Sequence, residues 1–382
     1  MSKDLLLEIG TEEIPAHYMP SILSQIKDLA HKKLDEANIS YESIRSLGTP
    51  RRVALLVGGV AEKQSDVSAK NKGPSVKIAY DSEGNPTKAA MGFARGQKIA
   101  VEDLVVEDGY VYANVTTVGK DTAGLLPDIL KDIILSLSFP KSMIWGDQTV
   151  HFVRPLRWFV ALFGTDVVPF EIAKVKSGRI SRGHRFLGTG DFEIPSMKDY
   201  ESVTREHFLI VDPEERKQMI LQGMQKLADE KGGTIIMDED LLEEVVFLVE
   251  YPTALCGEFD REFLQLPEAA IITPMKDHQR YFPMRDKDGK LMNLFLTVRN
   301  GDDYHLETVQ HGNERVLRAR LDDAKFFFEE DKKKKLIDRV DDLQRIVFQD
   351  GLGTLKDKAQ RLEQITTFLN HKLDLGLDDG DL

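Results

Sequence analysis

Apolar residues along the chain follow periods that predict alternating strands and helices. Continuous apolar runs over 4–9 and 53–57 predict strands that are buried on both faces. Between them, apolar residues such as Ile22 and Ile26 recur at helical spacing, which predicts an amphipathic helix over 20–37. The first part of the chain therefore has the pattern of a mixed α and β domain.

The middle of the chain keeps this alternation. Polar residues with glycine and proline punctuation over 61–97 predict a loop that closes with a helix over 87–95. Strands are predicted by period-two alternation over 110–118 and by the apolar run 158–163, and a helix by the spacing over 125–137. We therefore expect an α+β fold.

Capping and turn residues define the later elements. Asp212, followed by proline, is a typical N-cap, and the helix that it begins is expected to end at Gly232. An Asp-Gly turn predicts a hairpin of strands 280–284 and 291–298, because glycine accepts the positive φ that such turns need. A long helix is expected to start near Gly312.

The end of the chain has a purely helical pattern. From 336 onward, apolar residues recur at helical spacing but are too few to form their own core, so we expect the opening of an all-helical domain over 336–382. The preceding segment, 321–335, alternates acidic and basic blocks, which is typical of a solvated helical connector. A chain of 382 residues is long enough for two or three domains.

Composition and charge narrow the function classes. The 51 basic and 64 acidic residues give a net charge of −13, so any RNA contact must use a local basic patch. No apolar run approaches the roughly 18 residues that a membrane span needs. The single cysteine, Cys256, excludes an internal disulfide and a cysteine zinc cluster, and it predicts a reducing compartment, the cytoplasm.

Two clusters of basic residues are candidates for contact with RNA or a protein partner. One lies in a glycine-punctuated loop and the other within two turns of the long helix. They comprise Arg179, Arg182, His184 and Arg185 in the loop, and Arg315, Arg318 and Arg320 in the helix. We predict no metal site at His184, since no second ligand lies at a usual spacing.

Three other groups have two interpretations each. Glu12 and Glu13 have the composition of a catalytic pair, but successive strand residues point to opposite faces, which favours a structural role. Arg51 and Arg52 fit either a phosphate contact or a solvated strand entry. Segment 145–158 carries aromatic residues with arginines, a pattern of base stacking, although core aromatics beside paired arginines are favoured.

Seven segments resemble the beta subunit of bacterial glycyl-tRNA synthetase, in the order of that family. They are LLLEIGTEEIP, LGTPRRVALLV, VRPLRWFVALFG, SGRISRGHRFL, ITPMKDHQRYFPM, LTVRNG and GNERVLRARLDDAKFFFEED. They cover roughly residues 1–365. Family members are considerably longer, so we expect this chain to be an N-terminal fragment.

The resemblance implies a subunit of a class II synthetase with two α and two β subunits (α₂β₂), which joins glycine to tRNA(Gly). ATP and Mg²⁺ would act at the α subunit, so no cofactor is expected in this chain. The resemblance also implies a B3/B4-like α+β region over 1–320, the connector 321–335, and the start of an HD-like helical domain over 336–382. DNA and membrane partners are not expected.

The motifs agree with a non-catalytic role. The chain has no phosphate-binding loop, no class II G-x-G-x-x-x-R signature and no His-Asp dipeptide. Our hypothesis is a tRNA-recognition and assembly subunit without catalytic residues of its own. One alternative is a hydrolase that edits mischarged tRNA, by analogy with the B3/B4 domain of phenylalanyl-tRNA synthetase. The other is a scaffold that makes no RNA contact, which the net charge supports.

Overall fold

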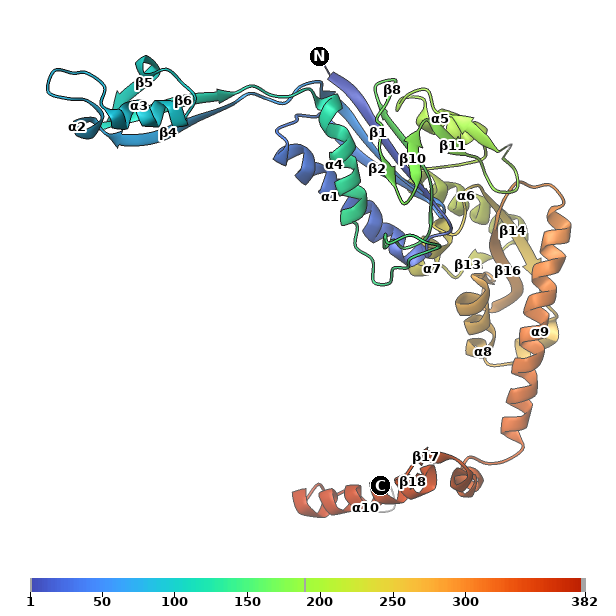
Figure 1. Cartoon of the computed structure of the whole chain (residues 1–382). Coiled ribbons are helices and arrows are strands. Elements are labelled where there is room, and N and C mark those ends of the chain that lie inside the picture. The colour runs from blue at the N-terminus through green and yellow to red at the C-terminus, as the bar shows by residue number, and fades with distance from the viewer. Residues whose placement is uncertain (1, 189, 379–382) are drawn as a thin grey trace. The chain divides into compact units, whose positions relative to one another are not determined.

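A computed structural model describes residues 2–188 and 190–378 of the chain. Figure 1 shows the course of the chain and its elements. Contacts divide the described residues into two units. The first unit comprises those of Met1–Cys256 and Leu296–Leu306, and the second comprises those of Gly257–Phe295 and Glu307–Leu382. The expected domain boundaries at 320 and 335 stay predictions, and the last four residues of the expected helical domain lie outside the described residues.

A seven-stranded sheet organises the first unit, with β1 (Ser2–Thr11) at its centre. β1 is antiparallel to both of its neighbours, and Leu6 lies opposite Leu56 on one side and Leu162 on the other. The path runs in the order β2 (Ser43–Thr49), β3 (Arg52–Ala61), β1, β7 (Leu156–Phe163), β10 (Val175–Gly178) and β9 (Glu171–Ile172), with β8 (Asp166–Val167) paired to β7. The strands predicted over 4–9, 53–57 and 158–163 are confirmed.

Both faces of this sheet are buried, which explains why its strands are apolar at successive positions. On one face, alternate residues such as Leu6 and Val160 pack with Tyr200 of α5 (Tyr200–Glu206). α1 (Met19–Glu36) contacts β2 and α4 (Thr122–Ser136). The predicted helices over 20–37 and 125–137 are therefore confirmed.

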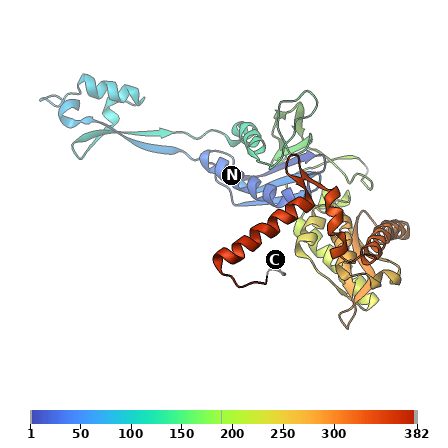
Figure 2. The ribbon, with the colours of Figure 1, turned by 90° about the horizontal axis from the view of Figure 1, so that it is seen from below.

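A small lobe is inserted between β3 and α4. A three-stranded sheet, in the order β4 (Val67–Ser75), β6 (Tyr110–Thr117) and β5 (Leu104–Glu107), is backed by α2 (Val76–Ala79) and α3 (Lys88–Gly96), as Figure 2 shows. The predicted helix and the strand over 110–118 are confirmed. The prediction of a loop from 61 is wrong, because β4 is a strand of small and polar residues without apolar alternation.

Local capping signals set the helices that follow. The Asp212 side chain accepts a hydrogen bond from the Glu214 amide, and α6 (Pro213–Lys231) ends at Gly232 with φ +67°. α7 (Glu239–Val246) follows its own aspartate cap. The predicted start and end of α6 are confirmed. One short antiparallel pair, β11 (Ile180–Arg182) with β12 (Asp191–Glu193), holds the loop that carries the first basic cluster.

The chain enters the second unit within β14 (Pro252–Glu258) and leaves it within β16 (Leu291–Asn300), whose hairpin partner is β15 (Phe282–Arg285). Gly289 has φ +79°, which confirms the predicted turn. Between β14 and β15 lie α8 (Glu268–Thr273) and a π-helix (Pro274–Gln279). α9 (Leu306–Lys332) starts six residues before Gly312, so the predicted start was late.

A compact apolar cluster holds these elements of the second unit together. Leu317 and Leu321 of α9 pack with Phe295 of β16 and with Tyr281. Farther along the chain, a 3₁₀ helix (Ile337–Arg345) and a short hairpin of β17 (Val347–Gln349) and β18 (Gly353–Thr354) precede α10 (Leu355–Leu373). The prediction of a purely helical pattern after Lys335 is therefore wrong at the hairpin.

The mixture of sheets and helices confirms the α+β class. Among the described residues, no helix combines the length and the apolar character that crossing a membrane requires.

Candidate nucleic-acid interface

The first basic cluster is a loop whose arginines have partners within the first unit. The Arg179 guanidinium donates to the Thr165 carbonyl oxygen at 2.8 Å, and Arg182 Nε lies 3.6 Å from Asp191 Oδ1. Arg182 also lies over the Trp158 ring, 5.2 Å from its centroid. These contacts fix the loop and neutralise part of its charge.

Arg185 makes the strongest of these contacts. Its two terminal nitrogens lie 2.8 Å from Glu12 Oε2 and 2.8 Å from Glu13 Oε1. The second Glu12 oxygen lies 3.0 Å from Arg157 Nε. The two glutamates are therefore ion-pair partners of arginines, in agreement with the structural interpretation of this pair.

His184 is buried, with 2% of its surface exposed. Its Nδ1 accepts hydrogen bonds from the amides of Phe186 and Leu187, so Nε2 carries the proton and donates to Asn300 Oδ1 at 2.9 Å. The Asn300 oxygen also accepts from the Glu250 amide. Both ring nitrogens are thus used to shape the loop, and the predicted binding role of His184 stays a prediction.

A buried polar network that the sequence did not predict lies behind this loop. Glu8 is fully buried within β1, where its carboxylate accepts hydrogen bonds at 2.5 Å from Trp158 Nε1, Ser181 Oγ and the Tyr200 hydroxyl. Burial, together with the nearby Glu8 charge, raises the pKa of Tyr200 well above its ordinary value. The only sequence signal is an acidic residue inside an otherwise apolar strand.

Arg52 joins the two buried carboxylates of the network. Its guanidinium lies 3.6 Å from Glu8 and 3.4 Å from Glu250, and it donates to the Arg182 carbonyl oxygen at 2.8 Å. Burial lowers the pKa of Arg52, but the charges of Glu250 and Glu8 outweigh that effect and raise it. Both interpretations offered for Arg52, a phosphate contact and a solvated strand entry, are wrong because the side chain is fully buried.

Within 145–158, two of the three aromatic residues follow the interpretation as core aromatics, whereas Trp145 is half-buried. Phe152 and Trp158 are buried, with 2% and 6% of their surfaces exposed. Arg157 pairs with Glu12, and Arg154 donates to the carbonyl oxygen of Val153. The Trp158 ring lies so close to Gly10 that a Cβ there would be 1.9 Å from it, so only glycine fits beneath the indole.

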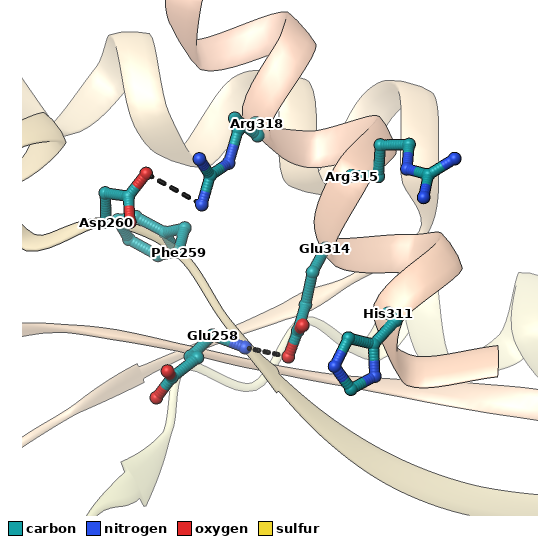
Figure 3. A pocket seen from close by; sticks show the side chains of 7 residues that line it. All are labelled: Glu258, Phe259, Asp260, His311, Glu314, Arg315 and Arg318. Atoms are coloured by element: carbon teal, nitrogen blue, oxygen red, sulfur yellow. Dashed lines mark hydrogen bonds and ion pairs between the residues drawn. The ribbon is translucent and has the colours of Figure 1, made fainter. Parts of the chain in front are cut away.

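The second basic cluster borders a cavity of about 380 Å³ in the second unit (Figure 3). His311, Arg315 and Arg318 line it from α9, because residues three and four apart share a helix face. The chain at the end of β14 supplies the opposite wall, which consists of Glu258, Phe259 and Asp260. Glu314 also lines the cavity from α9 and accepts a hydrogen bond from the Glu258 amide at 3.0 Å, so the α9 side carries both cations and a carboxylate.

The cations in this cavity differ in their partners. Arg318 is ion-paired with Asp260 at 3.0 Å, as the dashed line in Figure 3 marks. His311 Nδ1 donates to the Glu307 carbonyl oxygen at 2.7 Å, which leaves Nε2 unprotonated when the ring is neutral. Arg315 and Arg320 are exposed and form no ion pair within the described part of the chain. These two arginines are the available cations of the cluster.

Among the described residues, no group of three or more His, Cys, Asp or Glu side chains is arranged to hold a metal ion.

Comparison with known proteins gives a consistent result. The family model described as glycyl-tRNA synthetase beta subunit matches residues 5–380. A protein of Desulfitobacterium hafniense (strain DSM 10664 / DCB-2) named glycine–tRNA ligase beta subunit is 48% identical over 386 residues, which cover 100% of this chain and 56% of that relative.

Two further relatives carry the same name. The Bacillus subtilis (strain 168) protein is 48% identical over 98% of this chain and 55% of its own length. The Syntrophus aciditrophicus (strain SB) protein is 45% identical over 99% of this chain and 55% of its own length. The chain spans just over half the length of these relatives. Because the match extends over nearly all of its residues, the chain belongs to the glycyl-tRNA synthetase beta subunit family.

Proposed function

We propose that this chain is the tRNA-recognition and assembly part of a glycine–tRNA ligase beta subunit. In this proposal the α subunit of an α₂β₂ enzyme charges tRNA(Gly) with ATP and Mg²⁺, and this chain orients the tRNA without forming bonds. Orientation of this kind lowers a barrier by removing motional freedom before the reaction. We further propose the B3/B4-like assignment for 1–320, the HD-like assignment from 336, and a cytoplasmic location.

The single observation that carries the proposal is the presence of two arginines on α9, Arg315 and Arg320, that are unpaired within the described part of the chain. Arg315 lines an open cavity, and Arg320 is exposed; neither guanidinium has a carboxylate partner among the described residues. In a chain of net charge −13, unpaired guanidinium groups on one helix are the groups best suited to a phosphate or to a carboxylate of the α subunit. The loop arginines are weaker candidates because carboxylates or carbonyl oxygens already hold them.

The test is aminoacylation of tRNA(Gly) by a purified α subunit of the family, with and without this chain. Direct binding of the chain to the α subunit and to tRNA(Gly) is measured in parallel. We expect the chain to stimulate charging and the double variant Arg315→Ala/Arg320→Ala to reduce that stimulation about tenfold or more. Arg285→Ala is the matched control, because this guanidinium is held by Glu268 at 2.7 Å. A double variant as active as the parent chain would exclude these two arginines as the contact.

A scaffold without RNA contact is a second candidate. The neutralised arginines of the loop and the net charge of −13 favour it. A chain that binds the α subunit and restores charging, yet shows no affinity for tRNA by itself, would support the scaffold and contradict direct recognition.

A further inference from the structure

The inserted lobe has one sheet face that no other described element of the first unit covers. Its other face packs on α2 and α3 through Leu104, Val111 and Ala113. Successive strand residues point to opposite faces, and residues directly opposed across strands share a face. Lys72 lies opposite Tyr112, and Tyr112 lies opposite Val105, so all three belong to the uncovered side.

This uncovered side, which we name the open face, carries a specific set of side chains. They include Lys70, Lys72, Val105, Glu107, Tyr110, Tyr112 and Asn114. Tyr112 is half-buried and the others are exposed. The Asn114 side chain makes no hydrogen bond to any described residue. The set combines aromatic rings, cations, one carboxylate and a free amide on one face of the sheet.

Each lysine lies close to a tyrosine ring. Lys72 Nζ is 3.6 Å from the Tyr110 centroid, and Lys70 Nζ is 4.7 Å from the Tyr112 centroid. Lys70 is also paired with the Glu107 carboxylate. Lys72 has no carboxylate partner among the described residues, so its charge is available to a ligand. An exposed cation–π contact is weaker than the stacking of a base on a tyrosine, so a base can displace the ammonium from the ring.

The net charge of the lobe, compared with that of the rest of the chain, favours an anionic ligand at this lobe. Residues 67–117 contain six basic and six acidic residues, so the rest of the chain carries the whole net charge of −13. The lobe therefore lacks the bulk repulsion that the remainder exerts on a polyanion.

We propose that the open face binds single-stranded RNA, with bases stacked on Tyr110 and Tyr112 and with Lys72 at a phosphate. Two residues along a strand advance about 6.8 Å, which places the rings in series for two neighbouring unstacked nucleotides. Asn114 supplies a donor and an acceptor for a base edge. Double-stranded RNA does not fit, because its bases are stacked on one another and present no free ring face to a flat sheet. This inference rests on the proposed RNA-binding function, but it assigns a surface distinct from α9.

The test is binding of a fluorescently labelled, ten-nucleotide single-stranded RNA to the whole chain, followed by anisotropy. We expect Tyr110→Ala and Tyr112→Ala each to weaken the affinity about tenfold, while Tyr110→Phe retains it. Lys72→Ala is expected to weaken binding and to lower the salt dependence by about one counterion. Tyr304→Ala is the matched control, because Tyr304 is 68% exposed but lies outside the lobe.

Three results would overturn the inference: tyrosine variants that bind as the parent chain does, an RNA duplex that binds as tightly as the single strand, or an acidic peptide that binds where RNA does not. Far-UV circular dichroism of each variant separates a lost contact from a lost fold. Charging with the α subunit distinguishes the two proposals. If the chain stimulates charging but ignores the oligonucleotide, the open face is wrong and the proposed function stands.

Discussion

At the residue scale, the most constrained group is the buried pair of Glu8 and Arg52. Glu8 could be noticed in the sequence as an acid within an apolar strand, but its partners come from residues 52, 158, 181 and 200. No local period connects positions so far apart. The sequence therefore identified the basic loop but not the network that supports it. It also could not indicate that Glu12 and Glu13 form ion pairs with Arg185.

Removal of Glu8 tests this network. We expect Glu8→Ala to lower the free energy of unfolding by about 3–5 kcal/mol, because it leaves the Arg52 charge buried with one partner fewer. Urea denaturation of both chains measures the difference. Glu12→Ala, which removes the partly exposed partner of Arg157 and Arg185, is the control and should cost about 1 kcal/mol or less. Equal losses for the two variants would contradict the structural importance of the buried pair.

Tyr281 predicts a pH dependence of stability. Burial raises its pKa to about 12, and its hydroxyl donates to Asn313 at 2.7 Å. In the unfolded chain the phenol ionises near pH 10, so its contribution is complete below pH 10 and is lost as the pH rises to about 12. We expect Tyr281→Phe to flatten the fall in unfolding free energy between pH 10 and 12.

The matched control for this pH effect is Tyr304→Phe, which changes an exposed ring. Its unfolding free energy should fall with pH as steeply as that of the parent chain. A slope that stays unchanged in Tyr281→Phe would show that this phenol is not the source of the alkaline loss.

At the scale of elements, the sequence predicted best where a local signal defines an end. Asp212 and Gly232 bound α6 as expected, since a cap and a left-handed residue act within one turn. β4 was missed because its two faces carry Lys70 and Lys72 on one side and Ala69 and Asn71 on the other, so no apolar alternation marks the strand. Its partner strand, distant in sequence, is what makes it a strand.

The same substitution at two helix glycines should have opposite effects. Gly232→Ala places a Cβ at φ +67° and should destabilise the chain by about 1 kcal/mol. Gly92→Ala lies inside α3 with open space around the new Cβ, and should stabilise the lobe by roughly 0.5–1 kcal/mol. Thermal unfolding monitored by circular dichroism compares them. Two shifts of the same sign would contradict the assigned conformations.

At the scale of the whole molecule, the distribution of charge limits how RNA can be held. The chain has 51 basic residues, yet carboxylates hold many of the cations near both clusters. Few phosphates can therefore be neutralised without first breaking ion pairs. Net charge was readable from the sequence, whereas the pairing of individual arginines required the fold.

The salt dependence of tRNA binding tests this view. We expect the logarithm of the affinity to fall with the logarithm of salt concentration with a slope no steeper than about −4. Glu12→Gln/Glu13→Gln, which releases Arg185, should steepen it by about one or two. Asp229→Asn/Glu230→Gln makes the same change in net charge at the end of α6 and should leave the slope as it was. A parent slope near −8 would mean that the ion pairs open on binding.

The ends of the inserted lobe lie beside each other. Lys63 and Asp121 form an isolated antiparallel β-bridge. The Gln64 amide donates to the Lys120 carbonyl oxygen at 2.9 Å, and the Thr122 amide donates to the Glu62 carbonyl oxygen at 2.9 Å. An antiparallel pair of this kind can be closed by a two-residue turn. We therefore expect that the DNA encoding the lobe can be deleted, or replaced by DNA encoding a reporter domain. The junction lies where β3 and α4 keep their hydrogen bonds.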